Sequence, residues 1–141
     1  MYNVDVYKTK AVRLPGKDFR IIYKKAYDFY KELKRKTKRR PYVRSAYFKK
    51  EKIFLELFWH HLNDKKNLRD KKRRVRYFPC AIELIIRSKF RPISKENPNK
   101  RSEILHRFAG ITPEKNMFFV QIKEDKKSGN KWLISVFPWE K

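Results

Sequence analysis

The sequence predicts an α+β domain in which N-terminal helices pack on a C-terminal antiparallel sheet of three or four strands. Three observations support this fold class. Before residue 90, apolar residues recur at intervals of three and four, which is typical of amphipathic helices. Residues 116–125 and 131–139 instead alternate apolar and polar side chains, as half-buried strands do. The length of 141 residues suits a single domain. We expect a basic, mainly helical half over residues 1–90 and an antiparallel β-meander with the functional site over residues 102–139.

The N-terminal segments are expected to form an edge strand and one long helix. Residues 3–8 alternate weakly and predict a short strand. The Leu14-Pro15-Gly16 break then precedes a helix predicted over residues 17–37. This helix ends in a basic run at residues 34–40, which complements the helix dipole but is longer than capping requires. Phosphate binding is therefore an equally good interpretation of that run.

Two further helices are predicted before the sheet. Residues 50–62 form one, and its adjacent His60 and His61 diverge by about 100° on a helix, which favours structural roles. The most basic window, residues 65–76, runs into a second apolar stripe, with Pro79 kinking or restarting the helix. Residues 91–102 are polar, contain two prolines and predict a loop.

Composition indicates a folded protein with a polyanionic partner. Thirty-nine Lys and Arg against 15 Asp and Glu give a formal charge of +24, and this self-repulsion destabilises a chain that has no anionic partner. Aromatic residues make up 16% of the chain, more than a disordered basic tail carries. We expect RNA as the partner, with DNA as the alternative. An anionic membrane surface ranks below both, and we expect no membrane partner.

Cysteine usage and the absence of targeting signals suggest a cytoplasmic protein. Cys80 is the only cysteine and lies among apolar residues, so we expect a buried, unreactive side chain. The N-terminus has no apolar run of signal-peptide length, and no 18 apolar residues follow one another. A toxin that is exported and delivered into a target cell would have the same features.

The two C-terminal strands place three polar residues on one face. With Gln121 opposite Ser135 and Lys123 opposite Leu133, the apolar sets of the two strands stay together. We therefore expect Phe118, Val120, Ile122, Trp132, Ile134 and Val136 on the core face. Gln121, Lys123 and Ser135 would share the other face, which is either solvated or a ligand-binding surface.

His106 lies in a preceding strand, predicted over residues 102–109 with a turn at 110–113. Only histidine normally changes its charge near neutral pH. Pairing Ala109 with Asn116 would put His106 opposite Phe119, on the face of the three polar residues. A one-residue slip would instead hide it in the core.

A resemblance adds to this pattern. The segment S-E-x-L-H-R-F-A-G-x-T-P, followed by F-F-V-Q-I-K-E and I-S-V-F-P, resembles a phage-associated group of the barnase–EndoU–colicin–RelE-like nuclease superfamily, over about residues 97–138. The resemblance implies helices followed by an antiparallel meander, as in RelE-like toxins. It also implies a metal-independent endoribonuclease of phage, mobile-element or toxin type, with an acidic antitoxin or immunity protein as a candidate partner.

The resemblance further implies His106 as acid/base, with Arg107, Thr112, Gln121, Lys123 and Ser135 as site residues. Attack by the RNA 2′-hydroxyl needs a base, an acid and cations for the phosphorane. We expect His106, Lys123 and Ser135 to be catalytic, and Arg107, Thr112 and Gln121 to bind phosphate. Four basic residues are expected to bind the substrate elsewhere: Lys71, Lys72, Arg73 and Arg74.

We expect neither a cofactor nor a metal, because no carboxylate cluster or Gly-rich phosphate loop is present. The alternative function is a non-catalytic basic protein that binds RNA or DNA.

Overall fold

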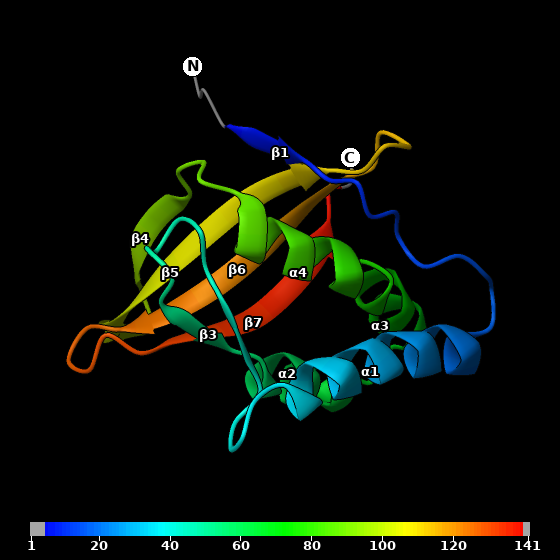
Figure 1. Cartoon of the computed structure of the whole chain (residues 1–141), viewed down its shortest axis with the longest axis horizontal. Helices are drawn as coiled ribbons and strands as arrows, with labels where there is room; N and C mark the ends of the chain where they lie inside the picture. The colour runs from blue at the N-terminus through cyan, green and yellow to red at the C-terminus, as the bar shows by residue number, and fades with distance from the viewer. Residues whose placement is uncertain (1–4, 140–141) are drawn as a thin grey trace.

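The computed structural model describes residues 5–139 and contains one mixed sheet of seven strands together with helices (Figure 1). Its elements, in chain order, are β1 (Val6–Lys8), α1 (Phe19–Arg35), β2 (Tyr42–Arg44), β3 (Lys52–Phe54), α2 (Glu56–Asp64), α3 (Leu68–Val75), α4 (Phe78–Arg87), β4 (Ile93–Asn97), β5 (Lys100–Ile111), β6 (Met117–Asp125) and β7 (Lys131–Pro138). The strand order is β1-β5-β6-β7-β3-β2, with β4 also paired to β5.

The predicted fold class is wrong in the size and type of the sheet. The antiparallel strands β4 to β7 form its centre, but β1 joins β5 in parallel and β3 joins β7 in parallel. Helices on a three- or four-stranded antiparallel sheet therefore do not describe this protein. The N-terminal half, expected to be mainly helical, contributes β1, β2 and β3 to the sheet. Strands of three residues carry too little alternation to be distinguished from a helix in the sequence.

Two segment predictions also fail. The helix expected over residues 50–62 begins only at Glu56, because Ile53 and Phe54 of β3 pair with Lys131 and Trp132 of β7. Lys49 and Lys50 have positive φ angles of 54° and 71°, which no helix allows. The loop expected over residues 91–102 contains β4 and the start of β5, joined in a hairpin.

The helix of residues 17–37 is confirmed as α1. Asp18 caps it, its side chain accepting a hydrogen bond from the Arg20 amide at 2.9 Å. Pro79 restarts the chain as the first turn of α4, where the missing amide hydrogen has no cost. The edge-strand prediction is confirmed at Val6–Lys8, while residues 3 and 4 lie outside the described residues.

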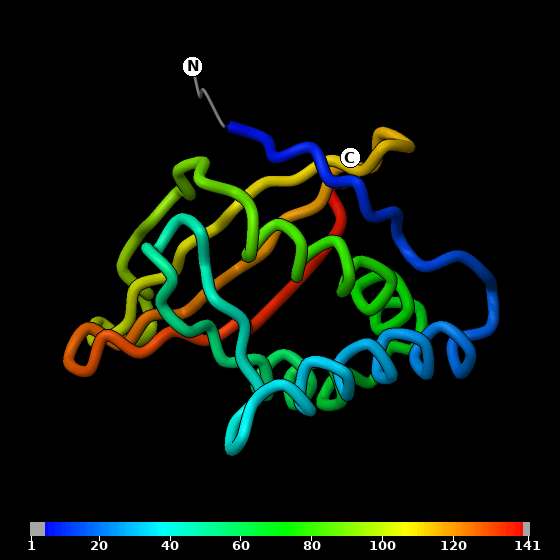
Figure 2. Tube along the Cα trace, in the orientation of Figure 1, coloured from blue at the N-terminus to red at the C-terminus, as the bar shows by residue number. Residues whose placement is uncertain are grey.

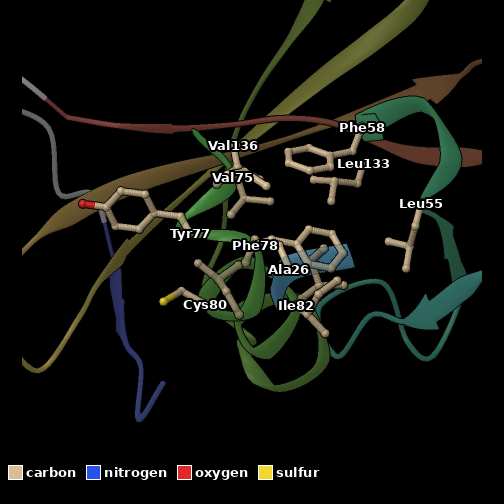
Figure 3. Close-up of a cluster of buried hydrophobic side chains, with 14 of the residues drawn as sticks. Ala26, Leu55, Phe58, Val75, Tyr77, Phe78, Cys80, Ile82, Leu133 and Val136 are labelled. Atoms are coloured by element: carbon tan, nitrogen blue, oxygen red, sulfur yellow. The ribbon is translucent and has the colours of Figure 1, made fainter. Parts of the chain in front are cut away.

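The hydrophobic core lies between the helices and one face of the sheet (Figures 1 and 3). Phe58 and Phe78 stack with ring centroids 5.2 Å apart, and Phe118 of β6 is fully buried beneath α4. Cys80 is also fully buried, and burial raises the pKa of its thiol to about 12. The prediction of a buried cysteine is therefore confirmed. Gly110 is needed for packing, since a Cβ there would lie 2.5 Å from the Phe118 ring.

The β6–β7 hairpin keeps the predicted register at its centre and loses it further along. Gln121 pairs with Ser135 as expected, but a bulge follows, so Ile122 pairs with Leu133 and Lys123 with Trp132. The bulge moves Leu133 into the core with no exposed area, while Trp132 and Ile134 remain half-buried. The prediction that Trp132 and Ile134 belong to the core face is wrong.

Candidate nucleic-acid interface

The second face of the sheet bears a row of aromatic and cationic side chains. Along β6, residues 118, 120 and 122 are buried while 117, 119 and 121 are half-buried, so one face lies against the helices and the other is uncovered. Figure 1 shows α4 crossing the covered face, with the other helices on the same side. We call the uncovered side the open face. Its aromatic residues are Tyr42, Phe54, Phe119, Trp132 and Phe137.

Every one of these five rings carries a cation within about 6 Å, the range of a cation–π interaction. The guanidinium of Arg40, which precedes β2, lies 3.9 Å from the centroid of Phe54 on β3. The Tyr42 ring has both Lys52 at 4.7 Å and Arg44 at 5.4 Å. These contacts leave the cationic groups at the surface, because all three cationic side chains are exposed on the open face or at its edge.

The centre of the open face repeats this arrangement. Arg107 of β5 lies 5.8 Å from the ring of Phe119 and 5.3 Å from that of Phe137, and the two rings are 5.4 Å apart. Arg107 also donates a long hydrogen bond of 3.4 Å to Gln121 Oε1. One guanidinium thus sits above two neighbouring rings, next to an amide that has free hydrogen-bonding capacity.

Helix α3 adds a further arginine to this centre. Arg74 Nη1 donates to Ser135 Oγ at 2.9 Å, and the guanidinium lies 5.7 Å from the Phe137 ring. Asp70 orients it, accepting both from Arg74 Nε at 3.1 Å and from Arg73 Nη2 at 2.8 Å. Burial raises the pKa of the Asp70 carboxyl, but the hydrogen bonds from the two arginines outweigh it and the pKa is lowered.

Lys123 lies at the other end of the same strand as Gln121. Its ammonium is 5.1 Å from the Trp132 ring and 3.4 Å from Glu103 Oε2. Burial raises the pKa of Glu103, whereas hydrogen bonds from Asn97 and Lys123 lower it, and the net direction is down. The predicted neighbours Gln121, Lys123 and Ser135 are therefore all on or beside the open face, as expected.

His106 does not join them, and the predicted register for it is wrong. In the structure Ala109 pairs with Phe119, and His106 pairs with Ile122 on the core face. The His106 side chain is 9% exposed, and the Phe48 ring lies edge-on 5.0 Å away. His106 and Lys123 therefore point to opposite sides of the sheet.

A polar network satisfies both ring nitrogens of His106. Nε2 lies 2.8 Å from Glu124 Oε1, and Nδ1 lies 2.6 Å from Ser94 Oγ. A carboxylate only accepts hydrogen bonds, so Nε2 donates to Glu124, and in the neutral ring the Ser94 hydroxyl donates to Nδ1. Lys131 continues the network, 3.8 Å from Glu124 and 2.6 Å from Glu51. This arrangement is that of a hydrogen-bonded core histidine.

The remaining predicted residues are dispersed. Thr112 is 3% exposed, and its hydroxyl accepts from the Asn116 amide at 3.1 Å inside the β5–β6 turn. Lys71 and Lys72 are half-buried on α3. Lys72 Nζ donates to the Lys17 carbonyl at 3.1 Å. Thr112 thus supports a turn, and the α3 lysines face a different region from His106.

The aromatic residues of the open face were not predicted as site residues, although the alternation of one strand indicated one of them. Alternation put Phe119 on the same side as Gln121 and Lys123, and an aromatic residue on a polar strand face indicates a binding surface. Within residues 5–139, no group of three potential metal ligands from His, Cys, Asp and Glu occurs. The same residues include no helix that is long and apolar enough to span a membrane.

Comparison with known proteins yields no match to a family model, to a curated protein or to a solved structure.

Proposed function

We propose that the protein binds single-stranded nucleic acid along the open face of its sheet. The observation that carries this proposal is the pairing of five half-buried rings with six cations on one uncovered surface. Proteins that bind single strands combine stacking rings with cations that follow the backbone. RNA is the expected strand, and DNA offers the same phosphates and bases to this surface.

The geometry favours a single strand over a duplex. Bases that stack on Phe119 or Phe137 must expose a ring face, and paired bases inside a helix do not. The cations already above the rings suit this mode. As phosphates attract Arg107 and Arg74, the guanidinium groups move toward the backbone or stack with the base themselves. The formal charge of +24 adds a salt-dependent attraction for any polyanion.

The enclosure of His106 is why binding, rather than cleavage, is the proposed function. A general base needs hydrogen-bond access to the proton that it removes. His106 is buried, and both of its ring nitrogens are engaged within the network. Ribonuclease activity stays a prediction from the sequence. Nucleic-acid binding explains the rings and cations of the open face without requiring cleavage.

The proposal is tested by replacing the two central rings. We expect Phe119→Ala combined with Phe137→Ala to weaken binding of a single-stranded RNA, since stacking contributes about 1–3 kcal/mol per base, or about 5- to 150-fold in Kd. Phe29→Ala is the matched control, because Phe29 is an exposed phenylalanine on α1, away from the open face. Binding is measured by fluorescence anisotropy, with thermal melting to confirm folding.

Three ligands of equal length complete the experiment: single-stranded RNA, single-stranded DNA and an RNA duplex. Tighter binding of the single strands than of the duplex supports the proposal, and the difference in affinity between RNA and DNA identifies the preferred sugar. Equal loss of affinity in the open-face variant and in the Phe29→Ala control would refute it, as would a preference for the duplex that survives the double substitution.

A further inference from the structure

A second surface concentrates positive charge in a pocket. It has a volume of about 710 Å³ and lies where the chain before α1, helix α3 and the β5–β6 turn meet. Figure 2 shows the N-terminal segment passing close to the β5–β6 turn and the end of β7. Five cationic side chains line the pocket, and none of its described lining residues is acidic. The cationic residues are Arg13, Lys72, Arg73, Arg76 and Lys115.

The segment that carries Arg13 is fixed to α3. The Leu14 amide donates to the Arg76 carbonyl at 2.9 Å, and Arg76 Nη1 donates back to the Leu14 carbonyl at 3.1 Å. Lys72 Nζ donates to the Lys17 carbonyl at 3.1 Å. Bonds to carbonyl groups hold Lys72 and Arg76 in place without neutralising them, whereas Arg73 is paired with Asp70 at 2.8 Å. The positive groups are therefore organised before any ligand arrives.

Lys115 approaches from the opposite wall in a strained conformation. Its φ angle is 71°, a left-handed conformation that non-glycine residues seldom adopt. The Thr112 carbonyl accepts from the Lys115 amide at 2.9 Å, and the Thr112 hydroxyl holds the Asn116 amide. Glycine would fit this turn better, yet the chain carries a lysine there, in the lining of the pocket. Such strain is typical of functional positions.

Trp139 adds a ring to the rim. Half of its surface is exposed, and its amide donates to the Met117 carbonyl at 2.9 Å, which anchors the residue beside the pocket. An exposed tryptophan next to a concentration of cations offers stacking for one base adjacent to a phosphate.

We propose that this pocket binds a terminal phosphate of the nucleic-acid strand, with the terminal base stacked on Trp139. A terminal phosphomonoester carries about −1.5 to −2 charge at neutral pH, whereas an internal phosphodiester carries about −1. Arg13, Lys72, Arg76 and Lys115, besides the Asp70-paired Arg73, exceed the need of one internal phosphate and suit the doubly charged end. Consecutive residues of α3 link the two surfaces, since Arg73 lines the pocket and Arg74 lies over Phe137. The inference rests on the proposed function for the strand beyond its end.

The experiment compares one RNA sequence with a 5′-phosphate, with a 3′-phosphate and with hydroxyl ends. We expect one phosphorylated form to bind about tenfold more tightly than the hydroxyl form, the effect of a charge-assisted hydrogen bond. Lys115→Gly should abolish this preference while the melting temperature stays the same or rises, because glycine relieves the positive φ. Lys127→Gly, in the exposed β6–β7 loop, removes the same charge elsewhere and should keep the preference.

Tryptophan fluorescence provides a second readout with a smaller probe. Adenosine monophosphate should quench the wild-type protein more strongly than adenosine does, and Trp139→Phe should lose this difference, whereas quenching at Trp132 of the open face would be common to both proteins. Equal affinity for phosphorylated and hydroxyl ends would overturn the inference, and if the open-face variants still weakened binding, the proposed function would stand without it. Conversely, the open-face variants could bind with normal affinity while phosphorylated ends are still preferred. That result would support the terminal-phosphate pocket and refute binding along the open face.

Discussion

The salt dependence of binding follows directly from the number of cations on the open face. Neutralising a phosphate of a single strand contributes about −0.7 to the slope of log affinity against log salt. If each of the six cations meets a phosphate, the slope is about −4, and affinity falls about 250-fold between 50 and 200 mM salt. Replacing Arg44, Lys52 and Lys123 by Gln should reduce this slope to about −2, a loss of about 16-fold over the same range.

The assay is a fluorescence-anisotropy titration of a labelled single strand at four or more salt concentrations. Three exposed lysines of α1 serve as the control set, since their replacement changes the net charge equally but leaves the open face intact: Lys24, Lys25 and Lys31. An unchanged slope in the open-face variant, or an equal decrease in the α1 variant, would show that the phosphates do not bind the open face.

Three other outcomes test the fold and the site. Leu133→Ala should lower the free energy of unfolding by about 2–5 kcal/mol. Ile134→Ala should lower it clearly less, because the bulge turns Ile134 out of the core. Urea denaturation measures both losses. Burial raises the pKa of Glu83, but hydrogen bonds from two backbone amides and from Tyr7 outweigh it and lower the pKa. The stability that Glu83 contributes is therefore present above the ordinary carboxyl pKa and lost as pH falls toward the lowered one, so melting temperatures between pH 7 and 3 should drop further for wild type than for Glu83→Gln. Total RNA incubated with the protein in EDTA should remain intact. Cleavage by the wild type that is lost in His106→Ala would instead support the predicted ribonuclease activity.

The parts of the fold that the sequence predicts well are those with long periodic segments. Helix α1, strands β6 and β7 and the loop between them lie where the spacing places them, and Gln121 faces Ser135. In α1 and β6 a run of nine or more residues repeats one period, and a slip would expose an entire apolar face.

The register of His106 could not be predicted from the sequence, because it depends on the position of one turn. We expected the turn at residues 110–113, but Gly110 and Ile111 extend β5, and the turn is closed by hydrogen bonds between Thr112 and Asn116. This changes the pairing by an odd number of residues, so His106 moves from the open face to the core. The bulge after Gln121 has the same effect on β7, and neither feature has a glycine signature in the sequence.

The parallel pairing of β1 and the whole of β3 were missed for a different reason. β1 and β3 are three residues long and join the sheet through partners more than 75 positions away, Ala109 in one case and Lys131 in the other. No local pattern encodes such pairings. Placing β2 and β3 in the sheet is also what adds Tyr42 and Phe54 to the open face, so the fold error concealed two of its five rings.

Photocrosslinking tests the central claim most directly. A single-stranded RNA that carries a photoreactive uridine at successive positions is irradiated in complex with the protein, and the attached peptides are identified by mass spectrometry. The open-face account predicts adducts on β2, β3, β6 and β7, at Tyr42, Phe54, Phe119, Trp132 or Phe137. Adducts confined to the outer surfaces of α1 and α4, with none on these five residues, would contradict it.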